Sequence, residues 1–271
     1  MGTVDLPQER QAHLRSFAER LAAAWKAADT VGDIVDEEVP RDRPEAYFAQ
    51  DRMADVLGEP VTGWKIGATS AKMREMDGHD DIVPGRLFPS NTHLGTSSTV
   101  DVGRCPNPRV ETEFGFRLLD DIPLRDSPWT ADEVATRLIL HPAFEIIGNR
   151  FVHPSAPPPV LSLMGIADNG GGLAALFGDP VEEWRGIDYR SHPVSFRVDD
   201  RPEAENFLGE MRCEPTQAVA DLANLLAGRG YGLRRGDMVL TGAATVPQPV
   251  SAGSHLVADF GPLGRLELDI A

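Results

Sequence analysis

The stretch Pro108-Arg-Val-Glu-Thr-Glu-Phe-Gly-Phe116 alternates polar and apolar side chains and carries two glutamates, Glu111 and Glu113. Successive side chains of a β-strand point to opposite faces, so a strand here places both carboxylates on the same side. A third glutamate, Glu145, stands in a second apolar run, residues 143–148, that also reads as a strand. If the two strands are neighbours, three carboxylates converge.

Two explanations fit this glutamate pattern. A half-buried strand often carries glutamates on its solvent face, and on spacing alone this is the commoner reason. Buried carboxylates without partners are instead strongly unfavourable and require compensation. A divalent hard cation such as Mg²⁺ or Mn²⁺ supplies it, because oxygen ligands suit these ions. Spacing alone leaves both explanations open.

Composition limits the class of protein. The 271 residues suffice for one large domain, or for one domain with an appendage. The formal net charge of −16 argues against nucleic acid or an anionic membrane as a partner. No apolar stretch is long enough to span a bilayer, and the N-terminus lacks a signal-peptide pattern. Cys105 and Cys213 are the only cysteines, which excludes a disulfide framework and favours a cytoplasmic protein.

The first sixty residues are predicted to form a helical N-terminal region. Apolar residues recur there at helical spacing, namely Leu14, Phe17, Leu21 and Trp25. Residues 33–40 are acidic and non-periodic, and are expected to form a loop. A second helix is expected to follow, with Asp42 as its N-cap and Gly58 as its stop.

From residue 61 to residue 271, short apolar runs alternate with Gly, Pro and Asn breaks, which indicates strands and turns. The expected strands cover residues 62–68, 109–119, 143–148, 194–198, 237–241, 255–260 and 265–270. Two helices interrupt them: one begins with a capping box from Thr130 to Glu133, and the other has Pro215 near its start. Because strands dominate and do not alternate regularly with helices, we predict an α+β fold with a mixed or mostly antiparallel sheet.

Two further segments have chemistry that the pattern leaves undecided. Lys65, in Gly63-Trp-Lys-Ile-Gly67, is either a strand lysine whose head reaches water or a partly buried cation that attracts an anionic substrate. Asp168-Asn-Gly-Gly-Gly172 is either an ordinary turn or a set of backbone N–H groups that holds a carboxylate. No phosphate-binding glycine loop and no Gly-x-Ser-x-Gly nucleophile motif occurs.

Six short motifs, in order and covering nearly the whole chain, resemble the 2-oxopent-4-enoate hydratase and 4-oxalocrotonate decarboxylase group of the fumarylacetoacetate hydrolase superfamily. They are Trp64-Lys-Ile-Gly-Ala-Thr69, Gly85-Arg-Leu-Phe88, Pro108-Arg-Val-Glu-Thr-Glu113, Phe144-Glu-Ile-Ile-Gly-Asn-Arg150, Ala167-Asp-Asn169 and Leu240-Thr-Gly242. Each motif alone is weak, and their order makes the resemblance specific.

The resemblance implies a mixed β-roll or barrel with flanking helices, preceded by the small helical region. It implies that Mg²⁺ or Mn²⁺ is held by Glu111, Glu113 and Glu145. It implies catalytic roles for Lys65 and Asp80, with Asp80 in a stretch, residues 78–85, that looks like the family's mobile loop. Further residues at positions implied to contact the substrate are Arg150, Asp168, Asn169, Gly170 and Thr241.

The implied substrate is a small anionic 2-oxo acid that reacts through a dienolate. The first reading is a hydratase of a short 2-oxo-alkenoate of the 2-hydroxypenta-2,4-dienoate type, in meta-cleavage-type aromatic catabolism. The second is a decarboxylase of a 2-oxo-enedioate of the 4-oxalocrotonate type, which the segment Thr241 to Val250 favours.

Two other readings stay open. A hydrolase of carbon–carbon bonds in acylpyruvates would require a His/Glu pair that activates water, for which His79 beside Asp80 is the candidate. A non-catalytic partner subunit would dock on an active homologue; Gly171, where the family often has a hydroxyl, favours it, and the intact glutamates oppose it. The resemblance also implies a homo-oligomer, alone or complexed with a homologous enzyme.

Overall fold

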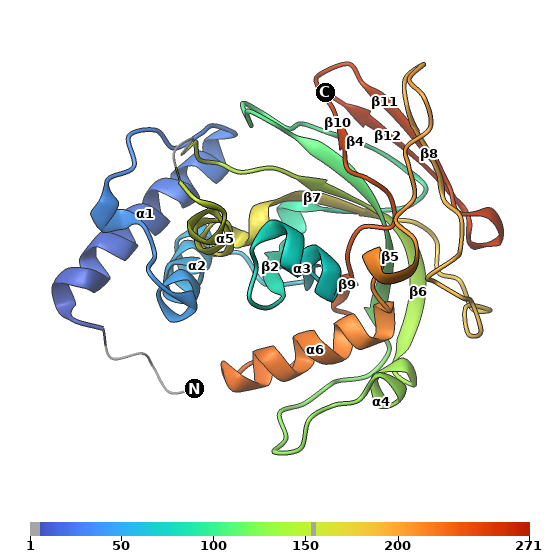
Figure 1. Ribbon diagram of the computed structural model, residues 1–271, viewed down its shortest axis with the longest axis horizontal. Helices are drawn as coiled ribbons and strands as arrows, with labels where there is room; N and C mark the ends of the chain where they lie inside the picture. The colour runs from blue at the N-terminus through green and yellow to red at the C-terminus, as the bar shows by residue number, and fades with distance from the viewer. Residues whose placement is uncertain (1–5, 153–155) are drawn as a thin grey trace.

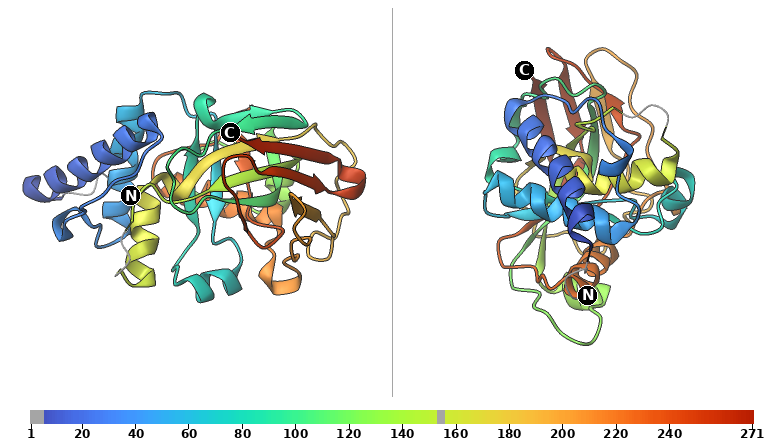
Figure 2. Two further views of the ribbon diagram at one scale, coloured as in Figure 1. Left: turned by 90° about the horizontal axis from the view of Figure 1, so that it is seen from above. Right: turned by 90° about the vertical axis from the view of Figure 1, so that its left-hand side faces the viewer.

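The computed structural model describes residues 6–152 and 156–271 of the chain. The helices of the N-terminal region lie at one end of the molecule and the strands form two curved sheets toward the other, while further helices lie along the sheets (Figures 1 and 2). This arrangement agrees with the predicted α+β class. Among the described helices, none is both long enough and apolar enough to cross a membrane.

The N-terminal region contains the two predicted helices, α1 (Gln8–Ala27) and α2 (Arg43–Leu57). Helix α2 begins as expected, since the Asp42 side chain accepts a hydrogen bond from the backbone N–H of Glu45 at 2.9 Å. It ends at Gly58, whose φ of 71° is the left-handed conformation that glycine adopts without strain. The expected loop between the helices contains a short 3₁₀ helix, η1 (Asp36–Glu38).

The described strands form one sheet of eight strands and a second of four. The first has the order β2-β1-β9-β5-β6-β7-β3 with β10 paired to β5, and the second has the order β4-β12-β11-β8. The first sheet is mixed, as predicted, because β1 runs antiparallel to β2 and parallel to β9. The strands are β1 (Gly63–Gly67), β2 (Val83–Leu87), β3 (Thr92–Leu94), β4 (Ser97–Val100), β5 (Arg109–Leu118), β6 (Leu138–Ile147), β7 (Gly172–Phe177), β8 (Ser195–Val198), β9 (Met238–Leu240), β10 (Gln248–Pro249), β11 (His255–Asp259) and β12 (Arg265–Ile270).

Each predicted strand is present, but β6 is longer than expected and several strands were not predicted. Strand β6 begins at Leu138 and continues through Pro142, which lies opposite Phe114 of β5. Strand β2 contains both Pro84 and Gly85, residues that disfavour strands, and is held by antiparallel pairing to β1. Strand β7 carries no β-branched residue.

The remaining helices border the large sheet. Helix α3 and helix α5 were not predicted, whereas α4 and α6 were. Their bounds, with those of the 3₁₀ helices, are α3 (Ala71–Asp77), α4 (Ala131–Ala135), α5 (Pro158–Ala167), α6 (Pro215–Gly228), η2 (Pro89–Asn91), η3 (Asn169–Gly171), η4 (Gly209–Met211) and η5 (Gly261–Leu263).

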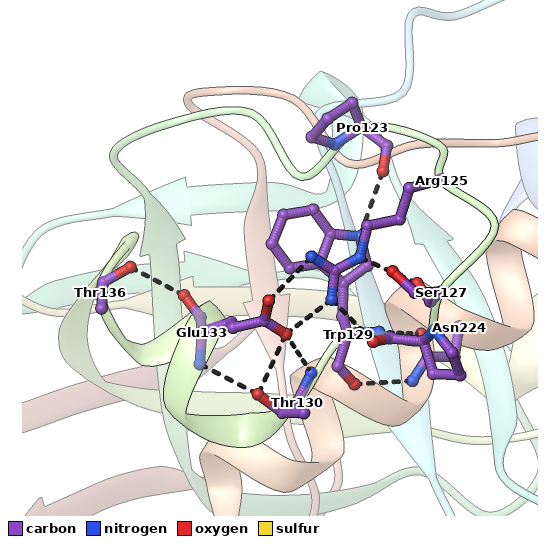
Figure 3. A network of polar contacts seen from close by, with 9 residues as sticks. Pro123, Arg125, Ser127, Trp129, Thr130, Glu133, Thr136 and Asn224 are labelled. Carbon is purple, nitrogen blue, oxygen red and sulfur yellow. Dashed lines mark hydrogen bonds and ion pairs between the residues drawn. The ribbon is translucent and has the colours of Figure 1, made fainter.

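Contacts among neighbouring residues hold helix α4 in position (Figure 3). The predicted capping box is present, because Thr130 and Glu133 exchange side-chain hydrogen bonds with each other's backbone N–H. Both Glu133 carboxylate oxygens also accept from Arg125, whose guanidinium lies 3.7 Å from the Trp129 ring centroid. Asn224 of α6 then bonds the backbone N–H and C=O of Trp129, which ties α4 to α6.

The hydrophobic core has a main cluster between the two sheets and a second cluster beneath the N-terminal helices. The Phe144 and Phe196 rings, 5.6 Å apart, join the sheets. The second cluster combines residues of α1 and α2, such as Phe17 and Met53, with later residues of the chain. These include Phe88 just after β2, Phe151 after β6, and Met164 of α5. The division at residue 60 stays a prediction, and the second part of the chain completes the core of the first.

A polar cluster also fastens α2 to the sheet and to α6. Asp51 accepts from Arg86 of β2 at 2.5 Å and from Arg229, which caps α6, at 2.7 Å. The two guanidinium groups stack near Trp64 and Tyr231. These contacts fix the position of α2 relative to the first strands of the sheet.

Candidate metal and substrate site

The register of β5 and β6 brings the three predicted glutamates together. Glu111 lies directly opposite Glu145, and Glu113 lies two residues further along the same face of β5. One carboxylate oxygen from each residue falls within 4.8 Å of the others. The explanation that these glutamates lie on the solvent face of a strand is wrong for two of them, since Glu113 is 0% exposed and Glu145 is 2% exposed.

Glu113 lacks full compensation for its burial. Its Oε2 accepts a hydrogen bond of 2.7 Å from the backbone N–H of Gly242, whereas its Oε1 is buried with no hydrogen-bond partner. Burial raises the pKa of Glu113 well above its usual range, and the nearby charges of Glu145 and Glu111 raise it further. Gly242 is required here, because its φ is 115° and a Cβ would lie 2.3 Å from Oγ1 of Thr69.

Lys65 is buried beside the carboxylates rather than extended into water. Its Nζ lies 3.1 Å from Oε1 of Glu145, and its side chain is 5% exposed. Burial alone would lower the pKa of Lys65, but the charges of Glu145, Glu111 and Glu113 outweigh burial and raise it, so the ammonium stays charged.

Glycines make room for the lysine stem on its way to the carboxylates. A Cβ at Gly85 would meet the backbone oxygen of Asn169 at 2.1 Å and Cδ of Lys65 at 3.0 Å. A Cβ at Gly170, whose φ is 69°, would lie 3.1 Å from the same Cδ. The Asp-Asn-Gly-Gly segment is therefore a tight turn packed over the lysine.

The donor set fits a hard divalent cation. Three carboxylates and one ammonium leave an excess of negative charge, and the unpartnered Oε1 of Glu113 is a ligand atom without a protein donor. Oxygen donors of this kind suit Mg²⁺, Mn²⁺ or Ca²⁺.

A cavity of about 1040 Å³ opens from the carboxylates. On one side it is bounded by β5 and the segment after β9, including Glu111, Gly242 and Ala243. Helices α3 and α5 form the other wall, with apolar side chains such as Met73 and Leu161. Its size and mostly apolar walls suit a small organic ligand that is anchored by a few polar groups.

The predicted substrate-contacting residues are close to the cavity, but most of them serve each other. Arg150 and Asp168 form a buried ion pair of 3.0 Å, and the backbone N–H of Arg150 donates to the same carboxylate. The Arg150 guanidinium stacks 4.0 Å above the ring of Trp25 in α1. This pair fixes the end of β6 against the end of α5.

Two of the other three residues of that group also have structural partners. The Asn169 side chain bonds both the N–H and the C=O of Arg86 in β2. The Thr241 hydroxyl donates to the backbone oxygen of Phe114. Of the five, Gly170 lines the cavity.

Asp80 is not brought to the site. It forms an ion pair with Arg43 of α2, and its side chain is 75% exposed. Its neighbour His79 does line the cavity, where Nδ1 lies within hydrogen-bond distance of the Ser162 hydroxyl. The His/Glu pair expected of a hydrolase is therefore a His/Ser pair here.

Several polar residues that line the cavity were not predicted as site residues, among them Arg109, Ser162 and Cys213. Arg109 precedes Glu111 by two positions on β5, so the same alternation could have revealed it. Ser162 lies in α5 and Cys213 shortly before α6, and no sequence pattern around either residue predicts that it lines the cavity.

Comparisons with known proteins identify solved structures that share this fold. No family model matches the chain. Its fold is that of the fumarylacetoacetate hydrolase superfamily: a putative family member from Yersinia pestis CO92 superimposes with a TM-score of 0.52 at 16% identity, over 79% of this chain and 94% of the other. A 4-oxalocrotonate decarboxylase from Pseudomonas putida G7, solved with magnesium and adipate, superimposes with a TM-score of 0.80 at 22% identity, over 96% and 98%.

Sequence relatives narrow the class further. A 2-keto-4-pentenoate hydratase of Paraburkholderia xenovorans (strain LB400) is 26% identical over 266 residues, which cover 97% of this chain and 95% of the relative. A 4-oxalocrotonate decarboxylase of Pseudomonas sp. (strain CF600) is 26% identical over 233 residues, which cover 82% and 85%. The chain is a homologue of these hydratases and decarboxylases, as the sequence resemblance predicted.

Proposed function

We propose that the protein is a divalent-metal-dependent hydratase that adds water to a short 2-oxo-alkenoate of the 2-hydroxypenta-2,4-dienoate type. The observation that carries the proposal is the cluster of three carboxylates within 4.8 Å, beside a buried lysine, at the inner end of the cavity. The hydratase among the sequence relatives supports this choice of reaction.

The proposal gives each residue of the cluster one task. Glu111, Glu113 and Glu145 would hold Mg²⁺ or Mn²⁺, which when bound supplies a Lewis acid for the oxygens of a 2-oxo acid. Lys65 stays protonated and lies at the same place, so it would attract the substrate carboxylate and stabilise negative charge on the dienolate. The apolar walls would keep bulk water from the reacting carbons.

The five predicted contact residues take supporting tasks in this proposal. Gly170 would lie against the substrate, since it lines the cavity. Arg150 with Asp168, Asn169 and Thr241 would hold the surrounding strands and turn in place through the bonds described above.

The test is turnover of 2-hydroxypenta-2,4-dienoate, followed by loss of its ultraviolet absorbance, with Mg²⁺ and with chelator. Glu111→Gln, Glu113→Gln and Glu145→Gln should each remove most activity while the fold is kept. Glu267→Gln, on β12 of the other sheet, is the matched control. Full turnover in chelated wild-type protein would overturn the proposal.

A second candidate, decarboxylation of a 2-oxo-enedioate, is favoured by Arg109. This residue lines the cavity on the same strand face as Glu111, about 7 Å before it at strand spacing. A cation at that distance could receive the far carboxylate of a diacid. Release of carbon dioxide from 4-oxalocrotonate, lost in Arg109→Gln, would favour this reaction over hydration.

Assembly and location complete the proposal. We infer a cytoplasmic protein from its two cysteines. We infer a homo-oligomer, alone or complexed with a homologous enzyme, from the sequence resemblance. Light scattering of the purified chain tests the homo-oligomer. The intact carboxylates and lysine oppose a non-catalytic partner subunit.

A further inference from the structure

The wall of the cavity opposite the carboxylates carries a second polar group, the pair formed by His79 and Ser162. His79 follows α3 and Ser162 lies in α5, so 83 residues of chain separate them. Both line the cavity, and Ser162 is 7% exposed. The apolar side chains of Met76 and Leu161 line the same cavity.

The position of the pair matches the far end of a short acid anchored at the carboxylates. From Ser162, helix α5 continues to Ala167, and the turn that contains Gly170 and packs on the stem of Lys65 follows it. At the rise of an α-helix, this separation is on the order of 10 Å. A five-carbon acid whose 2-oxo acid end is anchored at the carboxylates would cover most of that span.

We propose that His79 is the proton-transfer residue at the far end of the substrate and that Ser162 positions its ring. This inference rests on the proposed hydratase function. Imidazole can give and take a proton near neutral pH, which no other side chain on the α3–α5 wall can do within the described residues. Asp80, the relay implied by the family resemblance, is turned to solvent and paired with Arg43.

The chemistry balances with one residue serving two steps. The enol proton of the dienol leaves to solvent, and Nε2–H of the His79 imidazolium gives its proton to C5. The electron pair of C4=C5 forms the new C–H bond, C2=C3 shifts to C3=C4, and the 2-oxo group forms. Nε2 then takes a proton from water as the water oxygen bonds C4, and C3 takes a proton from solvent. One water is added in total.

Ser162 suits this cycle because its contact is the same in both states of the ring. In the imidazolium, and in the neutral ring left after Nε2 gives up its proton, Nδ1–H donates to the serine oxygen. The ring therefore keeps its orientation while Nε2 exchanges protons.

The experiment compares His79→Gln, His79→Ala and Ser162→Ala with wild type, using 2-hydroxypenta-2,4-dienoate and Mg²⁺. His79→Gln should lower kcat by about 100-fold or more, with oxalate affinity in the presence of Mg²⁺ changed by less than about twofold. Added imidazole should restore turnover to His79→Ala, and Ser162→Ala should lower kcat by about tenfold. His255→Gln, an exposed histidine on β11, is the matched control and should behave as wild type.

Each outcome decides a different claim. A wild-type protein without metal-dependent hydration overturns the proposed function and this inference together. An active wild type whose His79→Gln variant turns over normally overturns the inference alone. If Asp80→Asn abolishes turnover while His79→Gln retains it, the relay belongs to Asp80. Failure of imidazole to rescue a folded, oxalate-binding His79→Ala protein shows that His79 transfers no proton.

Discussion

Replacing Glu113 with glutamine should stabilise the metal-free protein and at the same time abolish its stabilisation by Mg²⁺. The amide oxygen of glutamine can still accept from Gly242, so the hydrogen bond that Oε2 makes is kept. The charge is removed from a fully buried side chain whose other oxygen has no partner.

The size of the gain follows from the spacing of the charges. Two full charges 4.8 Å apart repel by about 3.5 kcal/mol at an effective dielectric constant of about 20. Glu111 and Glu145 both repel Glu113, and attraction to Lys65 cancels about one of these two terms. Because Glu113 has a raised pKa and can relieve part of this repulsion by taking up a proton, we expect about 1–3 kcal/mol at pH 8, which is about 2–10 °C in Tm for a chain of this size.

The pH dependence has a definite sign. The pKa of Glu113 is raised in the folded protein, so its proton stabilises the fold at low pH. That stability is lost as pH rises from about 4.5 through the raised folded value. Without metal, the advantage of the glutamine variant should therefore be small near pH 4 and should grow toward pH 8.

Thermal unfolding with chelator and with Mg²⁺ measures both effects. Wild type should gain about 2.7 kcal/mol when Mg²⁺ is at 100 times its Kd, and Glu113→Gln should gain far less. Glu267→Gln should follow wild type. A metal-free Glu113→Gln protein that melts below wild type, yet responds to Mg²⁺ as wild type does, would refute the reasoning. The carboxylate would then be a structural acceptor.

Three further predictions concern the site and its supports. Lys65→Met should lower turnover severely while Mg²⁺ affinity, read by calorimetry, stays equal or rises, because a cation 3.1 Å from a ligand is removed; wild-type kinetics would contradict this. Thr130→Ala should lower the free energy of unfolding, measured in urea, by about 1 kcal/mol, because the N-cap of α4 is lost. An unchanged urea midpoint would show that this cap does not stabilise the protein. Asp168→Asn should lower the free energy of unfolding by about 3–5 kcal/mol, since Arg150 is left buried without its counter-charge. A decrease of less than about 1 kcal/mol in the same assay would mean that water replaces the carboxylate.

Features that depend on a few neighbouring residues were predictable from the sequence. The caps at Asp42 and Thr130 involve partners three residues away, and both are confirmed. The shared face of Glu111 and Glu113 follows from the strand period alone. Burial of Glu113 does not follow from that period, and only the family resemblance favoured it in advance.

Features set by distant parts of the chain were not predictable. The register that places Glu145 opposite Glu111 depends on which strands pair. Helix α5 is apolar around most of its circumference, so it lacks the amphipathic period by which helices are recognised. The pairing of Asp80 with Arg43 spans 37 residues and turns the predicted relay away from the cavity.

The shared core under α1 and α2 means that the N-terminal region is not a removable appendage. In a chain that began at residue 61, Phe88, Phe151 and Met164 would be exposed as one contiguous apolar surface. Arg86 and Arg229 would lose Asp51, the carboxylate with which both form ion pairs. Surfaces of that kind drive self-association. Removing the N-terminal region would therefore yield aggregated protein rather than a smaller catalyst.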